Sequence, residues 1–329
     1  MNKTISSNLG ITLAGVLALT VTSAYADTFG PVGPNQFTID FVTIGNPGNA
    51  NDSGTTGSYF SPYGGVGYEY RMGKYEISED MIAKANALGG LRITKDTLGL
   101  NKPATGVTWN EAARFVNWLN VSSGYAAAYK FAVNPGDVGY TSNSVANANI
   151  ELWTESDAGY DPSNLYRNSN ARYVLPSEHE WYKAAYYSGS GTTYFDYATG
   201  SNTIPTAVAS GTGAGTAVYT FGVGVADITQ AGGLSAYGTM GQNGNVAEWQ
   251  ESAYTAPNDF SSESRTVRGG DWSEPANSLR ASTRINVATT GSTSTYGFRV
   301  ASVPEPSCAV LMCSASLLAL ARRRRRAAL

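Results

Sequence analysis

Apolar residues recur at helical spacing in only three short segments of this chain, and each segment follows a side chain suited to capping a helix. The caps are Ser78 for the first segment, Thr108 with Glu111 for the second, and Ser177 with Glu180 for the third. The last two pairs have the spacing of a capping box, and Gly89-Gly90 is placed to end the first helix. The predicted buried faces are Met81, Ile82 and Ala85; Ala112, Phe115, Val116 and Leu119; and Trp181, Ala184 and Ala185.

Outside these helices the pattern is one of short strands and long loops. Runs rich in β-branched and aromatic residues predict strands over 68–75, 171–175, 265–267 and 298–301. Residues 189–222 are low in charge and rich in Gly, Thr and Ala, but tyrosines interrupt them. We interpret this segment as an extended surface loop, because a flexible linker would lack such aromatic anchors.

The first 26 residues have the pattern of a secretory signal peptide. A single positive charge at Lys3 precedes an apolar stretch, and small residues at Ala24 and Ala26 suit cleavage by signal peptidase. The apolar stretch is shorter than the ~20 residues of a spanning helix, so a permanent membrane anchor is the weaker alternative. The mature chain is expected to begin at Asp27.

The C-terminal residues 303–329 combine three features in a fixed order. Pro304, Glu305 and Pro306 come first, an uncharged segment over 307–321 follows, and five arginines occupy 322–326. An apolar segment of fifteen residues covers only part of the hydrocarbon core of a membrane, so it is a marginal anchor. The arginines hold its end on the cytoplasmic side. This tail resembles the PEP-CTERM sorting signal of Gram-negative bacteria, which implies transient anchoring in the inner membrane and removal by an exosortase.

Setting these two ends aside changes the charge balance of the chain. Of 22 basic and 25 acidic residues, 16 and 24 lie in residues 27–302, so this body carries a net charge near −8. An acidic body argues against a nucleic-acid partner, because phosphate binding needs clustered Lys and Arg. The two cysteines, Cys308 and Cys313, both lie in the tail, so the body uses no disulfide.

Six motifs then occur in order along most of the body. They are YRMGKYEIS at 70–78, VTW at 107–109 leading to WL at 118–119, YVLPSEHEW at 173–181, GNVAEW at 244–249, RGGDW at 268–272, and GFRV at 297–300. The series resembles the sulfatase-modifying factor, or formylglycine-generating enzyme, domain. The resemblance implies an α+β fold: one irregular, loop-rich, C-type-lectin-like domain over 27–302, best matched over 66–302.

The resemblance raises the question of whether the family's oxidase chemistry is present. In formylglycine-generating oxidases, two cysteines shortly after the Arg-Gly-Gly motif bind copper. Here residues 268–280 contain no cysteine, and neither Ser273 nor Glu274 can replace a thiolate as a ligand for copper(I). We therefore expect no copper and no catalytic residue of this type. Iron bound by several histidines is also not expected, because His179 is the single histidine and on a predicted helix is interpreted as an exposed side chain.

Other catalytic arrangements find little support in the sequence. The body offers no Ser-His-Asp or Cys-His set, and the glycine-rich segments lack the Lys-Ser/Thr pair of a phosphate loop. Paired carboxylates remain open as a glycosidase alternative, either Glu178 with Glu180 or Glu248 with Glu251. A structural role is the better interpretation of the first pair, because acids in the first turn stabilise a helix.

The resemblance also implies a calcium site near the GNVAEW motif. The family uses a carboxylate matching Glu248, carbonyls matching Gly244 and Val246, and an Asp or Asn at the position of Gly241. Calcium prefers six to eight oxygen ligands, so the glycine weakens the site unless Gln242, Asn243 or water replaces the missing ligand. The alternative is that Glu248 pairs with a buried Arg or with backbone groups.

Three hypotheses about function follow. We favour a non-catalytic binding protein at the cell surface, outer membrane or extracellular matrix, whose Tyr-, Asn- and Ser-rich loops contact a polysaccharide or protein ligand. The alternative is an enzyme of the formylglycine-generating type that uses unrecognised chemistry. A third possibility is a structural component of an extracellular polysaccharide layer.

Overall fold

The computed structural model describes residues 25–54, 62–143, 149–220, 222, 224–255 and 257–304. Its three α-helices confirm the three predicted from the sequence: α1 spans Glu79–Gly89, α2 Trp109–Ser122 and α3 Glu178–Tyr186. Both predicted capping boxes form, and Gly90 ends α1 in the left-handed conformation that glycine adopts without strain. The predicted apolar faces of α2 and α3 are buried.

The first sheet has five strands in the order β1-β2-β3-β11-β4, all antiparallel. The strands are β1 Tyr25–Phe29, β2 Phe37–Ile44, β3 Tyr70–Gly73, β11 Ala301–Ser302 and β4 Tyr173–Val174. β11, the last strand of the described residues, thus lies between β3 and β4, and both of these strands are far from it in sequence. This arrangement closes the domain on itself.

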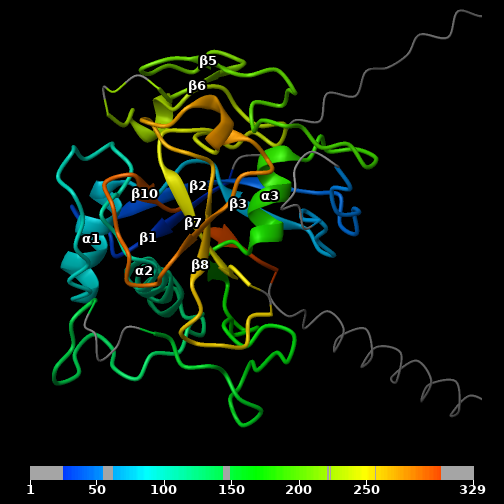
Figure 1. Cartoon of the computed structure of the whole chain (residues 1–329). Helices are drawn as coiled ribbons and strands as arrows, with labels where there is room; N and C mark the ends of the chain where they lie inside the picture. The colour runs from blue at the N-terminus through cyan, green and yellow to red at the C-terminus, as the bar shows by residue number, and fades with distance from the viewer. Residues whose placement is uncertain are drawn as a thin grey trace, which may run out of the picture.

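The second sheet has four strands in the order β10-β7-β8-β9. They are β10 Tyr296–Gly297, β7 Ala247–Ala253, β8 Arg265–Arg268 and β9 Ile285–Val287. β10 runs parallel to β7, and the other pairs are antiparallel. In Figure 1, β7 passes through the middle of the molecule, with α2 below it and α3 beside it.

Three strand predictions place a strand correctly, and one is wrong. β3, β4 and β8 lie within or beside the segments predicted over 68–75, 171–175 and 265–267. A continuous strand over 298–301 does not form, because β10 belongs to the second sheet and β11 to the first. The three residues between them cross from one sheet to the other, and their side chains Phe298, Arg299 and Val300 are fully buried.

The predicted surface loop over 189–222 is mostly irregular, and its aromatic residues anchor it as expected. Tyr197 and Tyr219 are buried and pack with Ala217 and Leu279. A short parallel pair, β5 Thr206–Ala207 with β6 Thr216–Ala217, forms at the outer edge of this region. Figure 1 shows the pair at the top of the molecule, away from α2.

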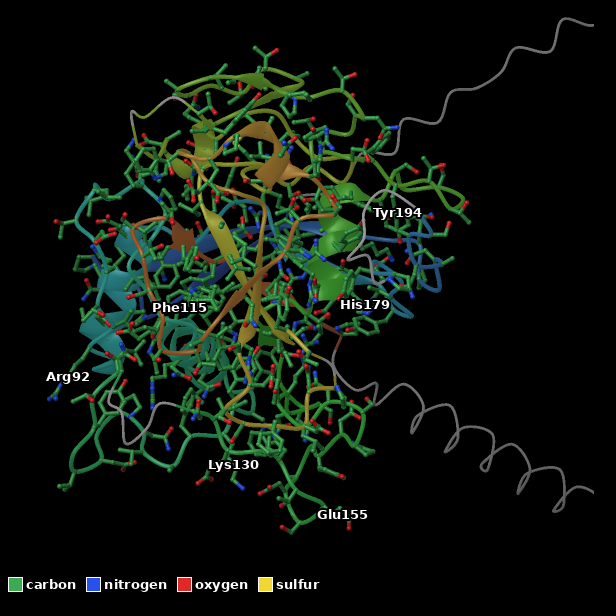
Figure 2. The ribbon with its side chains drawn as sticks, viewed as in Figure 1. Arg92, Phe115, Lys130, Glu155, His179 and Tyr194 are labelled. Atoms are coloured by element: carbon green, nitrogen blue, oxygen red, sulfur yellow. The ribbon has the colours of Figure 1, made fainter. Side chains whose placement is uncertain are left out.

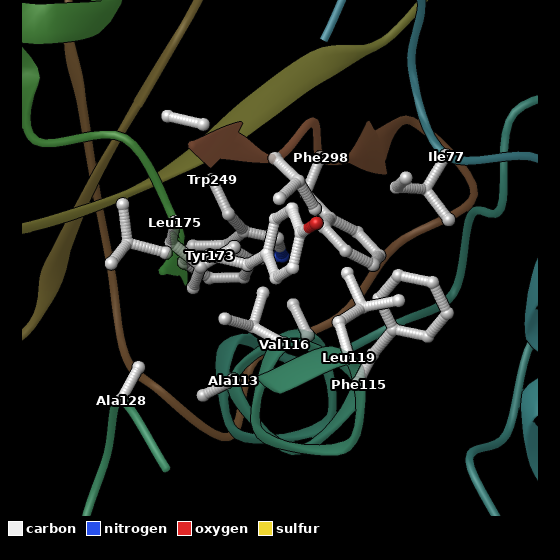
Figure 3. Packing of buried hydrophobic residues seen from close by; sticks show 14 of the residues in the cluster. Ile77, Ala113, Phe115, Val116, Leu119, Ala128, Tyr173, Leu175, Trp249 and Phe298 are labelled. Atoms are coloured by element: carbon white, nitrogen blue, oxygen red, sulfur yellow. The ribbon is translucent and has the colours of Figure 1, made fainter. Parts of the chain in front are cut away.

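The main hydrophobic core lies between α2 and the two sheets. Figure 3 shows Phe115, Val116 and Leu119 of α2 pointing toward Trp249 and Phe298. Burial of each such side chain stabilises the fold by about 1.5–3 kcal/mol before entropy losses. Among the described residues, no helix is both long enough and apolar enough to cross a membrane.

Candidate functional site

Four of the six sequence motifs meet in a buried group of polar side chains, which we call the motif cluster: Glu76, Trp181, Asn245, Glu248 and Arg299. At its centre the Glu248 carboxylate, on β7, accepts hydrogen bonds from Arg299 Nε and Nη2, both at 2.6 Å. Trp181 Nε1 of α3 donates a third bond, at 2.7 Å. All three side chains are 0 % exposed. The arrangement is therefore a desolvated, fully paired charge.

The remaining donors of Arg299 bind backbone carbonyls. Nη1 donates to the carbonyls of Gly73 and Lys74, and Nη2 donates to the carbonyl of Met240. This arginine therefore ties the end of β3 and the segment before the GNVAEW motif to β7. Because its hydrogen-bonding capacity is met by protein groups, Arg299 has a structural role in this position.

Glu76 is a second buried carboxylate in the motif cluster, and the sequence analysis missed it. Its Oε1 accepts a hydrogen bond from Asn245 Nδ2 at 2.9 Å, whereas Oε2 has no partner. Burial is the main cause that raises the pKa of Glu76 to about 7; the Arg299 charge opposes this rise and the Glu248 charge adds to it. This carboxyl group therefore takes up a proton in the folded protein as the pH falls through about 7.

The same geometry accounts for a glycine at position 241, where the resemblance implies an Asp or Asn. A Cβ atom on Gly241 would overlap the Glu76 carboxylate. Gly241 also has a φ of 79°, a left-handed conformation that favours glycine. The carboxylate of Glu76 thus occupies the space that a side chain at position 241 would need.

The residues predicted to bind calcium fit such an ion only in part. Glu248 already pairs with Arg299, whose positive charge opposes a cation on the same carboxylate, as the alternative interpretation of Glu248 expected. The described residues contain no group of three or more His, Cys, Asp or Glu side chains that could hold a metal ion. The unpaired Glu76 Oε2 suits a cation when the carboxyl group has lost its proton, that is, at a pH above about 7. Calcium binding through Gly244, Val246 and Glu248 stays a prediction.

The other carboxylates considered as a catalytic pair are also bound to arginines. Arg167 bridges Glu180 and Glu251, with distances of 2.8 and 2.7 Å. Burial alone would raise the pKa of Glu180, but Arg167, Tyr68 and the capping-box amide of Ser177 lower it to about 2. A carboxylate held in this way stays ionised and accepts no proton near neutral pH, which suits a structural role better than general acid catalysis.

Glu178, the remaining carboxylate considered for catalysis, is also bound to arginines. Its carboxylate lies 2.6 Å from Arg268 of β8 and 2.7 Å from Arg284, and its side chain is 2 % exposed. The Arg268 side chain also lies near the rings of Tyr63 and Tyr182, at 4.9 and 5.2 Å. The two glutamates that open α3 are thus each held by an arginine from elsewhere in the chain.

His179 lies between these two glutamates and is only partly exposed, contrary to the interpretation of it as an exposed side chain. Its ring meets Tyr63 edge-on with centroids 5.4 Å apart, and burial lowers its pKa. Figure 2 labels this side chain on α3. Its Nδ1 atom is buried without a hydrogen bond. A neutral imidazole packed on tyrosine is consistent with this environment.

The segment after the Arg-Gly-Gly motif is the place where the family's copper-binding cysteines would lie. Asp271 Oδ1 accepts hydrogen bonds from the amide and the hydroxyl of Ser273. A 3-10 helix, η3, then spans Ala276–Leu279, and Leu279 packs on Tyr197 and Tyr219 with 0 % exposure. Apolar packing and a local turn therefore occupy the segment.

The predicted processing sites lie at the limits of the described residues. Ala26 lies in β1 and pairs with Asp40, whereas Ala24 lies outside the described residues. Asp27, the predicted first residue of the mature chain, binds Arg71 through both carboxylate oxygens. Pro304 is described and exposed, and Glu305, Pro306 and the two cysteines lie outside the described residues.

Sequence reasoning missed Glu76, Arg167 and Arg299 as partners in the buried charge network. Glu76 and Arg299 both lie in motifs of the family, at 70–78 and 297–300, and these positions could have indicated that they are part of the site. The signal that was missing is pairing across the chain: Arg299 and Glu248 are 51 residues apart, and Asn245 and Glu76 are 169 apart.

Comparison with known proteins identifies the family. The family model of the sulfatase-modifying factor enzyme 1-like domain matches residues 64–303. A comparison with curated protein sequences finds no match.

Solved structures with the same fold include Treponema denticola variable protein 1, with 21 % identity and a TM-score of 0.59 over 86 % of this chain and 99 % of that one. CarF gives 18 % identity and a TM-score of 0.57, over 81 % of this chain and 98 % of that one. PvdO from Pseudomonas aeruginosa gives 16 % and 0.52, over 85 % and 100 %. At these identities the likeness concerns the fold alone, which is the predicted α+β, C-type-lectin-like one. The chain belongs to the sulfatase-modifying factor enzyme 1-like domain family.

Proposed function

We propose that this chain is an exported, non-catalytic binding protein that acts at the cell surface or in the extracellular matrix. One observation carries the proposal: the segment after Arg268-Gly269-Gly270 packs Leu279 into a hydrophobic cluster with Tyr197 and Tyr219, and residues 27–302 contain no cysteine. Copper(I) requires soft ligands such as thiolates, and the oxidase reaction requires copper. A domain of this family without them is best explained as a scaffold for recognition.

The buried charges support the same proposal. The four glutamates considered for acid-base catalysis are each bound to an arginine, so their carboxylates hold segments of the fold together. A binding protein needs only a stable scaffold and accessible contact groups. Tyr, Asn and Ser side chains on irregular loops provide contact area and adaptable hydrogen bonds for a polysaccharide or a protein ligand.

Delivery to the surface is part of the proposal. Signal peptidase would cleave after Ala26, the tail would hold the protein briefly in the inner membrane, and an exosortase would cut near Pro304, Glu305 and Pro306. The test is the mass of the protein recovered from the envelope and from the medium. Recovery of a form that retains both ends from the medium would contradict this route.

The binding function is tested by a screen of surface polysaccharides and envelope proteins with the purified protein. In parallel, the protein is incubated with copper, oxygen and a sulfatase-type cysteine peptide, and formylglycine is measured by mass spectrometry. Retention by a polymer or protein without peptide oxidation is expected. Clear turnover of the peptide would overturn the proposal in favour of a sulfatase-modifying enzyme with unrecognised chemistry.

Calcium at the GNVAEW motif is a secondary proposal, supported by the unpaired Glu76 Oε2. Glu248, with the carbonyls of Gly244 and Val246, would hold the ion, and calcium would supply charge neutralisation there. Thermal unfolding with added calcium and with a chelator tests it: a calcium-dependent rise of the midpoint that Glu76→Gln reduces would support the site. The same midpoint under both conditions would contradict it.

A further inference from the structure

A cleft of about 430 Å³ lies beside α2, and neither η3 nor the Arg-Gly-Gly segment contributes a residue to its lining. This volume falls within the range of about 300–1,000 Å³ that is typical of small-molecule sites. The end of α1, the outer face of α2 and the loop after α2 line it. The lining residues used below are Leu91, Arg114, Trp118 and Val121.

Arg114 is the charged residue that lines this cleft, and it has no carboxylate partner among the described residues. Its side chain is 2 % exposed, and Nη1 donates to the carbonyl of Val133 at 2.9 Å. Its Nε and Nη2 atoms are buried without hydrogen bonds, and its guanidinium lies over the rings of Phe131 and Tyr140, at 3.9 and 5.1 Å. A positive charge without an ion-pair partner among the described residues thus borders the cleft.

The nearest acidic residue on the same helix acts on Arg114 through its charge but forms no ion pair with it. Glu111, one turn earlier on α2, accepts hydrogen bonds from Thr94, Thr108 and Ser142. Its carboxylate is therefore directed to the capping box and to the segment after α1. Because charge interactions are weakly screened in protein interiors, the charge of Arg114 acts on a group in the cleft even where its N–H groups are covered.

Trp118 supplies a fixed aromatic surface next to this charge. A Cβ atom on Gly89 would overlap its indole, and its ring stacks on Phe37 with centroids 5.8 Å apart. Trp118 also lines a second cleft, of about 720 Å³, together with Leu88, Ser122 and Ser123. The indole therefore stands between two hollows on the same side of the molecule, which suits an extended ligand.

We propose that the two clefts lined by Trp118 bind an acidic polysaccharide, with a carboxylate-bearing sugar unit beside Arg114. This proposal rests on the binding function proposed above and names its ligand class and site. The C–H face of a sugar ring packs on the indole, and its carboxylate compensates the guanidinium charge. A neutral sugar would leave that charge uncompensated. The acidic body opposes binding only weakly, because charges beyond about 8 Å are largely screened at physiological salt.

The test measures binding of two probes of equal length to the full chain by calorimetry: tetramannuronate, which carries carboxylates, and mannotetraose, which is neutral. Arg114→Met keeps the length of the side chain, and circular dichroism checks its fold. We expect tighter binding of tetramannuronate and loss of that preference in Arg114→Met.

Variants of Val121 test the site without altering a buried residue. Val121 lines the cleft and is 62 % exposed. Val121→Glu should weaken tetramannuronate binding by about tenfold through like-charge repulsion, Val121→Lys should strengthen it, and Val121→Gln serves as the neutral control. Binding of mannotetraose should change little in all three.

Two results overturn the cleft assignment. One is equal or absent binding of the two probes by the full chain, and the other is identical tetramannuronate affinity in Val121→Glu and Val121→Gln. If the polymer screen still finds a bound polysaccharide or protein, the binding function stands and only this site is wrong. If the screen finds no ligand, the proposed function fails as well.

Discussion

The side of the molecule where α3 meets β7 and the side around α2 hold buried arginines in different ways. Beside α3 and β7, arginines meet carboxylates: Arg299 with Glu248 at 2.6 Å, Arg167 with Glu180 at 2.8 Å, and Arg268 with Glu178 at 2.6 Å. Around α2, Arg114 and Arg265 lie between aromatic rings instead. The rings are those of Phe131 and Tyr140 for Arg114, and of Trp109 and Tyr166 for Arg265.

The difference separates a structural charge from a charge that is available to a ligand. A buried ion pair fixes which segments lie together, and loss of one partner leaves the other uncompensated. Replacing an arginine that lies between aromatic rings leaves no carboxylate without its ion-pair partner. Arg114 and Arg265 share this environment and both have unpaired Nε and Nη2 atoms, but only Arg114 is among the residues that line the clefts described above.

The largest expected effect is the loss of the Arg299 charge. Arg299→Met would leave Glu248 buried opposite a thioether and also free three backbone carbonyls. We expect a loss of about 3–5 kcal/mol in the free energy of unfolding, the usual cost of breaking a buried pair. Urea unfolding measures it, with the exposed Glu155→Gln as a control (Figure 2). A loss below 1 kcal/mol would show that the pair does not hold the fold.

The second effect is acid sensitivity from the Arg167 bridge. The pKa of Glu180 is lowered to about 2 in the folded state, from its ordinary value of 4.5. The group therefore contributes stability above pH 4.5 that is lost as the pH falls through 2, amounting to roughly 3 kcal/mol. Unfolding free energies measured across this range should show the loss. In Glu180→Gln this part of the slope should vanish, and an unchanged slope would contradict the assignment.

The third effect has the opposite pH dependence. The pKa of Glu76 is raised from 4.5 to about 7, so its contribution to stability is complete below pH 4.5 and is lost as the pH rises through 7. Glu76→Gln keeps an acceptor for Asn245 and removes the titration. We expect the variant to gain on the order of 2 kcal/mol relative to the parent between pH 5 and pH 8. Parallel stability curves would mean that Glu76 does not bind a proton in the folded state.

Local signals made the helices predictable, because a cap and its apolar face lie within a few residues of each other. The period-two pattern of β2, with Phe37, Ile39 and Phe41 buried and Thr38 and Asp40 exposed, is also visible in the sequence and is sufficient to predict a strand there. β7 offers no such pattern, since Glu248, Gln250 and Glu251 are as buried as Trp249. Its polar residues are buried because distant partners meet them, and a single sequence does not show those partners.

The candidate site was predictable to a similar extent. The absence of cysteine after the Arg-Gly-Gly motif is visible in the sequence, and the alternative that Glu248 pairs with a buried Arg was foreseen. The overlap between Gly241 and Glu76 was not, because 165 positions separate the two residues in the sequence. The cleft beside α2 was also missed, since Arg114 reads as an ordinary polar position of an amphipathic helix until its neighbours are known.

The smallest expected effect is that of Arg114→Met, and it tests the comparison directly because Arg299→Met is the same chemical change. The Arg114 variant loses one hydrogen bond to the carbonyl of Val133 and the contacts of a cation with two rings. A methionine of similar length packs against the same rings, so we expect a loss of about 1 kcal/mol.

Arg265→Met provides the matched case, because Arg265 is equally enclosed by rings but does not line either cleft. Its loss of stability should be of similar size to that of Arg114→Met, whereas only Arg114→Met should change the binding of a carboxylated sugar. Urea unfolding and calorimetry on both variants separate the two properties. If Arg114→Met destabilises the protein as much as Arg299→Met, then Arg114 holds the fold together as Arg299 does. The distinction between the two sides of the molecule then fails.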